Sequence, residues 1–144
     1  MLKEIIEKKR YSFHDKFETW EDAVRAACVP LEEEGVIEKE YSSYIISNVH
    51  EFGPYIVIAP DICIPHAQEG RGVNETAIAF MHVNEPVDFG EGADYTARLF
   101  FVLASTDNEK HLANLSELVS LLDDEEIIGK FVTSQSAEDL QKLI

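Results

Sequence analysis

Histidine is the residue type in this chain of 144 residues whose chemistry is easiest to link to a function. The five histidines are His14, His50, His66, His82 and His111. A neutral imidazole is a competent nucleophile, and it is well populated at physiological pH because the ordinary pKa of histidine is about 6.5. His66 follows the apolar stretch FGPYIVIAPDICIP, and Pro65 restricts the backbone directly before it. His66 could be a reactive side chain displayed at a strand end, or a buried structural histidine.

His111 is the second histidine with a suggestive position. It falls in the first turn or so of a predicted helix, soon after the apolar run ARLFFVLA ends. Open α/β sheets usually bind ligands at the edge where strands end. We therefore expect His111 at such an edge, although a structural role is the alternative here too.

Other chemistries find little support in the sequence. The chain has no G-x-x-x-x-G-K-[ST] or G-x-G-x-x-G motif for nucleotides, no H-E-x-x-H for zinc and no G-x-S-x-G nucleophile motif. Three histidines could hold a metal in principle, but their wide spacing does not predict a metal site. Cys28 and Cys63 lack a C-x-x-C spacing, so both are expected to be reduced core residues. The acidic run DDEE at 123–126 is most simply a helix start.

The charge balance excludes several kinds of partner. Twelve basic against 28 acidic residues give a net charge of −16, which disfavours binding to nucleic acid and to anionic membranes. The start MLKEIIEKKRYSF has no apolar run typical of a signal peptide, and no later run approaches the roughly 20 residues of a membrane span. A cytoplasmic protein without direct membrane insertion is expected.

The elements that must position the histidines follow from hydrophobic periodicity. After a short amphipathic turn with Leu2, Ile5 and Ile6, helical patterns end at Gly35 and Gly53, where glycine is typical of a helix stop. Apolar β-branched runs then predict buried strands. The predicted helices cover 19–35, 37–53, 107–122, 124–132 and 136–144, and the predicted strands cover 55–59, 62–64, 76–83 and 97–104.

The order of helices, strands and helices predicts an α/β fold with a mixed β-sheet sandwiched by helices on both faces. Residues 1–144 contain no internal repeat or linker, so a single domain is expected. Thr19, Asp107 and Ser136 are the predicted N-caps. The buried stripe of the helix over 107–122 is expected to be Leu112, Leu115, Leu118, Val119 and Leu122. Asp61 is expected to be a turn residue after Pro60.

Four segments resemble a known family when they are taken in order. They are TWEDAVRAACVPLEEEGVIEKEY, FGPYIVIAPDICIPHA, EPVDFG and HLANLSELVSLL. Over residues 18–144 the chain resembles the enzyme IIA domains of the bacterial sugar phosphotransferase system, in the mannitol/fructose superfamily, and the nearest branch is the ascorbate-type IIA. The resemblance implies the mannitol-type IIA fold.

The resemblance also implies a phosphoryl relay. The histidine of the PHA segment, here His66, would accept a phosphoryl group from the phosphocarrier protein HPr and pass it to a cysteine of a IIB protein. His111 would be the second active-site histidine, assisting the transfer. No cofactor and no metal would be needed, a membrane IIC protein would be an indirect partner only, and the chain could form a homo-oligomer.

His50 stands near the place where related branches carry an arginine, which makes it a candidate phosphate-binding residue. The alternative is a solvated histidine favoured by the negative end of its helix.

The relay function that the resemblance implies also has an alternative. A regulatory IIA-like binding module would use the same fold to control a partner protein by docking and phosphorylation state.

Overall fold

The computed structural model describes residues 1–67, 71–90 and 95–143, and its centre is one β-sheet with the strand order β1-β4-β5-β3-β2. The strands are β1 (Tyr11–His14), β2 (Val57–Ala59), β3 (Asp61–Cys63), β4 (Ala77–Asp88) and β5 (Thr96–Ala104). β1 runs parallel to β4 and β3 parallel to β5, whereas the β4–β5 and β2–β3 pairs are antiparallel. The predicted mixed sheet is confirmed.

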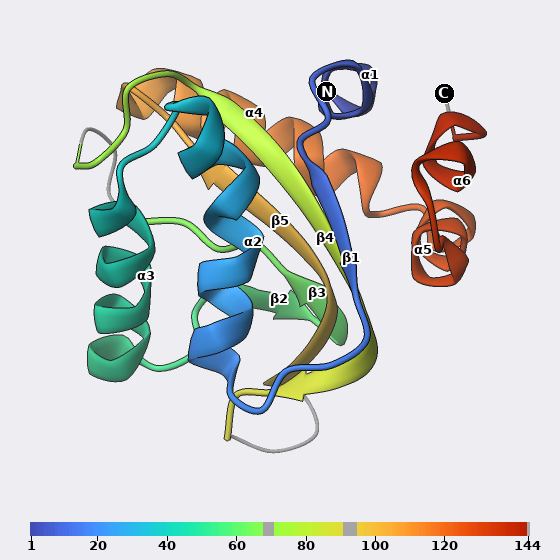
Figure 1. Ribbon diagram of the computed structural model, residues 1–144, viewed down its shortest axis with the longest axis horizontal. Coiled ribbons are helices and arrows are strands. Elements are labelled where there is room, and N and C mark those ends of the chain that lie inside the picture. The colour runs from blue at the N-terminus through green and yellow to red at the C-terminus, as the bar shows by residue number, and fades with distance from the viewer. Residues whose placement is uncertain (68–70, 91–94, 144) are drawn as a thin grey trace.

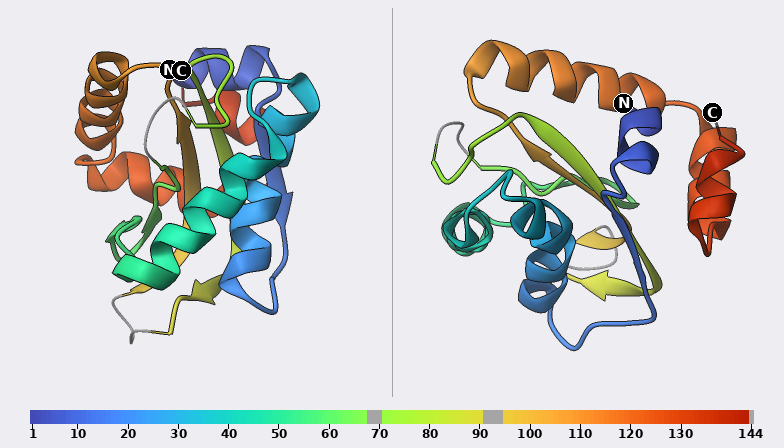
Figure 2. Two further views of the ribbon diagram at one scale, coloured as in Figure 1. Left: turned by 90° about the vertical axis from the view of Figure 1, so that its left-hand side faces the viewer. Right: turned by 45° about the horizontal axis from the view of Figure 1, so that its top comes forward.

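Helices cover both faces of this sheet (Figures 1 and 2). The helices are α1 (Leu2–Glu7), α2 (Trp20–Glu34), α3 (Lys39–Phe52), α4 (Asn108–Leu121), α5 (Glu125–Thr133) and α6 (Ala137–Gln141). α2 and α3 share one hydrophobic cluster with the sheet, and the other four helices share a second cluster on the opposite face. The expected sandwich of helices around a mixed sheet is therefore confirmed.

Alternation along the central strands separates the two clusters. In β4, Ala79 and Met81 belong to the cluster under α2 and α3, while Ile78 and Phe80 belong to the opposite cluster. Successive side chains of a strand point to opposite faces, so a continuous apolar run is what a sheet covered on both sides requires.

The predicted helix ends are confirmed by their capping contacts. The side chains of Thr19, Asp107 and Ser136 accept hydrogen bonds from the backbone N–H groups of Asp22, Lys110 and Asp139. Gly35 ends α2 in the left-handed conformation with φ of 82°, which glycine adopts without a steric penalty. In the part of the chain that is described, no helix is long and apolar enough to span a bilayer.

Three details of the sequence prediction need correction. Residues 11–14 were not predicted as a strand, yet they form the parallel edge strand β1 beside β4. The strands around Pro60 are shorter and shifted, because Tyr55 lies in a turn before β2 and Asp61 already belongs to β3. In α4, Leu118 is buried as expected, but Leu112 and Val119 are 59% and 46% exposed.

Candidate functional site

His66 lies directly beyond the end of β3, in a short segment tethered on both sides. The N–H of Ile64 donates to the carbonyl of Ile56 at 2.8 Å, and the carbonyl of Pro65 accepts from Leu103 of β5 at 3.0 Å. The His66 Nδ1 is 2.6 Å from the carbonyl oxygen of Ile64. Since a carbonyl oxygen can only accept, Nδ1 carries the proton, and the lone pair of the neutral ring is on Nε2.

Two tyrosines hold the backbone around His66. The Tyr55 hydroxyl donates to the carbonyl of His66, and its ring meets the imidazole edge-on with centroids 5.2 Å apart. The buried Tyr41 hydroxyl donates to the carbonyl of Leu103 at 2.6 Å and accepts from the N–H of Ala67 at 3.2 Å. These contacts orient the imidazole before any partner binds, and such preorganisation favours in-line transfer chemistry.

The structure brings His111 to His66. His111 is in the first turn of α4, where its N–H donates to the carbonyl of Asp107 at 3.1 Å. The two imidazole centroids are 5.4 Å apart. The His111 Nδ1 lies 3.4 Å from the hydroxyl of Ser105, a buried residue that follows β5. Both histidines are therefore at the edge where β3 and β5 end, as strand-end positions predict.

The surroundings of His66 favour its neutral form. Burial lowers the pKa of the imidazole from its ordinary value, the hydrogen bond to the Ile64 carbonyl raises it, and the nearby His111 lowers it; the net direction is downward. A neutral imidazole keeps its nucleophilic lone pair at physiological pH.

The two histidines open into a shared cavity of about 490 Å³. Its aromatic lining comes from α3 and the turn that follows: Tyr44, Phe52 and Tyr55. Among the described residues, its polar lining besides the two histidines includes Asn48, Glu51 and Arg71. Phe52 is 69% exposed, so the rim of the cavity presents apolar surface to solvent. The arrangement suits a group that is transferred between His66 and a partner docked over the rim.

His50 is not among the residues that line this cavity. Its Nε2 lies 3.2 Å from a carboxylate oxygen of Glu21 on α2, and its ring packs on Trp20 with centroids 5.0 Å apart. These contacts place His50 at the C-terminal end of α3, against α2. His82 is buried with Nε2 2.6 Å from the carbonyl of Val132, and His14 packs on Phe17.

Sequence inspection missed several residues of the site. Tyr41 and Tyr55 looked like ordinary helix and strand aromatics, and only the fold brings their hydroxyl groups to the segment around His66. Arg71 had no motif of its own. Within the described ranges, no group of three or more histidine, cysteine or acidic residues is arranged to hold a metal ion.

Solved structures with a similar fold define the class of protein to which this chain is similar. The crystal structure of IIA mannitol from Escherichia coli matches with a TM-score of 0.81 at 28% identity, over 94% of this chain and 95% of that one. The complex of enzyme IIA and phosphorylated enzyme IIB for mannitol from Escherichia coli matches with the same TM-score of 0.81 at 27% identity, over 94% of this chain and 93% of that chain.

The sequence comparisons agree with the fold. Residues 4–144 match the family described as "Phosphoenolpyruvate-dependent sugar phosphotransferase system, EIIA 2", and the chain belongs to this family. A curated relative, the ascorbate-specific PTS system EIIA component of Escherichia coli strain K12, is 27% identical over 141 residues, which cover 97% of this chain and 92% of the relative. The protein is accordingly a phosphotransferase component of a phosphoryl relay.

Proposed function

We propose that His66 is the residue that carries the phosphoryl group, accepting it from phospho-HPr and passing it to a cysteine of a IIB protein. One observation supports this assignment most directly. The hydrogen bond from His66 Nδ1 to the Ile64 carbonyl leaves Nε2 as the nucleophilic nitrogen, on a residue that lines the cavity shared with His111.

The acceptance step follows from that tautomer. The Nε2 lone pair forms a bond to phosphorus, while the bond that held the phosphoryl group on HPr breaks and its electron pair leaves with HPr. The Nδ1 proton stays in place, so the phosphorylated ring becomes cationic. The Ile64 carbonyl at 2.6 Å stabilises this charge without further movement.

The donation step restores the starting state. A thiolate sulfur of the IIB protein, whose proton has already gone to solvent, forms a bond to phosphorus, and the electron pair of the P–N bond returns to Nε2. His66 is then neutral again with Nδ1 still protonated. Phosphoryl transfer mainly requires positioning and stabilisation of charge on the equatorial oxygens, so the chemistry needs no cofactor.

His111 is the partner group for that charge. Its ring stands 5.4 Å from the His66 ring, centroid to centroid, and both residues line the same cavity. Ser105 Oγ, 3.4 Å from Nδ1, orients the ring. We infer that His111 donates a hydrogen bond to a phosphoryl oxygen and does not itself receive the group.

The partner protein and the transported sugar are inferred from similarity to known proteins. The relative from Escherichia coli strain K12 is specific for ascorbate, and the mannitol IIA of the same organism has been solved in complex with phosphorylated IIB. We infer a IIB protein as the acceptor and ascorbate-type uptake as the pathway that this protein serves.

The test is labelling with phosphoenolpyruvate, enzyme I and HPr. The wild-type protein should yield an acid-labile, base-stable adduct, and His66→Ala should yield none. His50→Gln is the matched control, because it removes an imidazole outside the cavity and should label normally. Labelling of His66→Ala at the wild-type level would show that the assignment is wrong.

A further inference from the structure

Arg71 differs from the other arginines in its contacts. The chain contains Arg10, Arg25, Arg71 and Arg98. Arg10 and Arg98 form charged hydrogen bonds with carboxylates, and Arg25 contacts the hydroxyl groups of two serines. Among the described residues, Arg71 has no such hydrogen-bond or ion-pair partner; its guanidinium carbon lies 4.1 Å from the ring centroid of Tyr44. Among the four arginines, Arg71 is thus the one whose N–H groups have no hydrogen-bond partner among the described residues, in a chain with 28 acidic residues.

The Arg71 side chain also lies at the candidate site. Arg71 lines the cavity together with His66 and His111. In the described part of the cavity wall the other charged or titratable groups are Glu51, Tyr44, Tyr55 and the two histidines, so Arg71 supplies the permanent positive charge. A phosphorylated His66 would bring a dianionic group into a cavity that also holds the Glu51 carboxylate. A positive charge in the cavity would stabilise that dianionic group.

The backbone next to Arg71 is fixed against the start of α3. The carbonyl of Gly72 accepts from the N–H of Glu38 at 2.8 Å. Gly72 has φ of 75°, and a Cβ there would lie 3.2 Å from the backbone nitrogen of Tyr41. This close approach keeps the chain beside α3, and the ring of Tyr44 supports the guanidinium. A cation–π contact consumes no hydrogen-bond donor, so the N–H groups of Arg71 remain available to an anion.

We propose that Arg71 contacts the phosphoryl oxygens of phosphorylated His66 and is the cationic phosphate-binding residue of this protein. The proposal rests on the function proposed above. His50, the other candidate for this role, is engaged with Glu21 and Trp20 and is not among the residues that line the cavity. The cation therefore comes from the segment after His66 instead of from the end of α3.

The experiment uses protein phosphorylated without any relay partner. Phosphoramidate transfers its phosphoryl group to histidine nitrogen with loss of ammonia, so it can modify His66 in the absence of HPr. The loss of the Nδ1 proton from the phosphorylated ring is then followed by phosphorus NMR against pH. Wild type, Arg71→Gln, Arg71→Lys and Lys130→Gln are compared, and His66→Ala identifies the signal. Lys130 is the matched control, because it lies on α5 on the opposite face of the sheet and also loses one positive charge.

A nearby cation favours the more negative, deprotonated form of the phosphohistidine, so Arg71→Gln should raise the pKa of the phosphorylated ring by about 0.5 to 1 unit relative to wild type. Arg71→Lys should recover most of this shift, and Lys130→Gln should match wild type. A purely structural role of Arg71 would not produce this charge-dependent pattern. Superimposable curves for wild type and Arg71→Gln would overturn the proposal, and so would a signal that persists unchanged in His66→Ala.

A parallel assay with phospho-HPr separates this proposal from the proposed function. Arg71→Gln should accept the phosphoryl group about tenfold more slowly than wild type, with Lys130→Gln unaffected. If wild type is not labelled by phospho-HPr although the chemically phosphorylated protein shows the shift, the relay assignment fails and the Arg71 contact stands. If phospho-HPr labels all variants equally and the titration curves coincide, the relay stands and the Arg71 proposal is wrong.

Discussion

The His66 imidazole is subject to contacts with opposite effects on its charge. Burial and the neighbouring His111 oppose protonation, while the Ile64 carbonyl favours it, and the net effect lowers the pKa. In the proposed relay, the same carbonyl would stabilise the ring after phosphorylation has made it cationic. A single backbone contact would thus serve both states that the proposal assigns to His66, the nucleophile and the phosphorylated carrier.

This balance predicts the pH dependence of the unphosphorylated residue. The nucleophilic form is present above the pKa of His66 and is lost as the pH falls through it. Because that pKa is lowered, the imidazole NMR signals of His66 should titrate with a midpoint below that of the same protein unfolded in urea, which should be about 6.5. A midpoint at or above the unfolded value would contradict the burial argument.

Removal of the His111 side chain should slow transfer without preventing folding. The ring is only half-buried, at the start of α4, so His111→Ala leaves no large cavity. Loss of one donor to a developing phosphoryl charge costs on the order of 10²-fold in rate. Single-turnover transfer from the phosphorylated protein to IIB measures this loss, with His50→Gln as the control. Wild-type transfer by His111→Ala would remove His111 from the mechanism.

Between elements, Tyr41 connects α3 to the end of β5 and to the segment after His66. Its hydroxyl bonds the Leu103 carbonyl and the Ala67 N–H, and Tyr41 is 1% exposed. Tyr41→Phe should therefore lower the free energy of unfolding by about 1 to 3 kcal/mol, because buried polar groups lose their partner. Urea denaturation measures the loss. Tyr95→Phe, which removes a hydroxyl at a 38% exposed position, should change stability little. Equal stability of Tyr41→Phe and wild type would show that these hydrogen bonds are replaced by other contacts.

Elements with strong local signals could be predicted from the sequence. The caps at Thr19 and Asp107 and the buried runs of β4 and β5 depend on neighbouring residues, and the structure agrees with them. The edge strand β1 has only four half-buried residues, so its pattern is too short to distinguish from a loop. Its existence depends on pairing with β4, which is distant in sequence.

The prediction of the buried stripe of α4 was partly wrong for a related reason. Helical spacing places Leu112 and Val119 beside the buried Leu118, but spacing does not say how wide a stripe the sheet covers. Both side chains remain substantially exposed. In the site, the strand-end argument placed His66 and His111 at an edge of the sheet, and the family resemblance paired them. The contacts of Arg71 with Tyr44, and of Asp61 with Arg98 at 2.9 Å, join distant segments, so no local pattern could indicate them.

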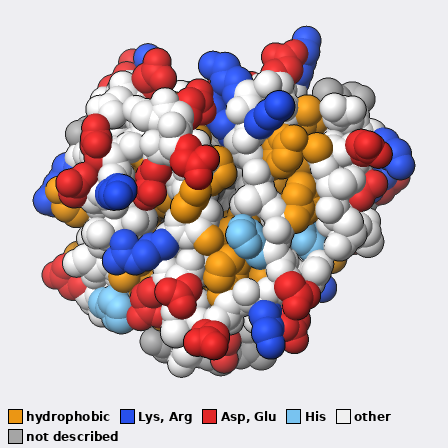
Figure 3. All heavy atoms as spheres, viewed as in Figure 1, with side chains coloured by type: hydrophobic (Ala, Val, Ile, Leu, Met, Phe, Trp, Pro, Cys, Tyr) orange, Lys and Arg blue, Asp and Glu red, His pale blue; other side chains and the backbone are white. Residues whose placement is uncertain are grey.

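At the scale of the whole molecule, surface charge is the first feature to consider. No single charged patch dominates the face that Figure 3 shows. Acidic side chains are spread over this face among basic and apolar ones. A net charge of −16 favours solubility and long-range repulsion of other anions. Contacts that cross between elements must hold the fold against this self-repulsion, and the few basic residues matter most where they are buried.

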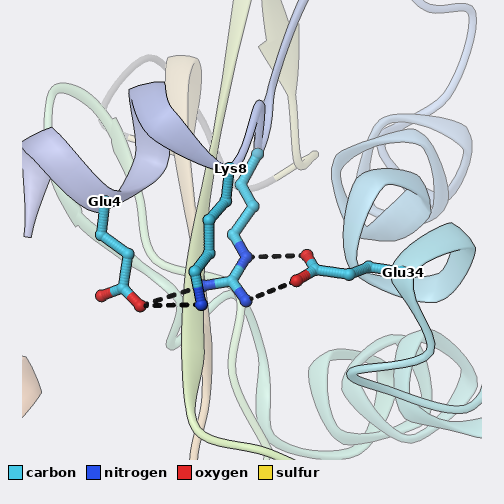
Figure 4. A network of polar contacts seen from close by, with 4 residues as sticks. Glu4, Lys8 and Glu34 are labelled. Atoms are coloured by element: carbon cyan, nitrogen blue, oxygen red, sulfur yellow. Dashed lines mark hydrogen bonds and ion pairs between the residues drawn. The ribbon is translucent and has the colours of Figure 1, made fainter.

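Arg10 is the clearest case of such a contact, because it lies just before β1 and bonds Glu4 of α1 and Glu34 of α2, both labelled in Figure 4. Its Nε and Nη2 each lie 2.8 Å from a carboxylate oxygen of Glu34, and its Nη1 lies 3.5 Å from Glu4, which Lys8 also contacts. Arg10 is 3% exposed, whereas Glu34 is 35% exposed. The pair is thus only partly screened by solvent.

Arg10→Met should lower the free energy of unfolding by about 1 to 2 kcal/mol near neutral pH, because Glu34 can rehydrate after the guanidinium is lost. The difference from wild type should depend on pH. The hydrogen bonds from Arg10 are the largest cause of a lowered pKa for Glu34, so its contribution is complete above the unfolded pKa of about 4.3 and is lost as pH falls through the lower folded value. Urea denaturation at several pH values measures this convergence. Lys3→Met, which breaks an exposed pair with Glu7, should match wild type throughout. A stability gap for Arg10→Met that stays constant into the acid range would mean that Arg10 acts through packing of its aliphatic stem and not through its charge.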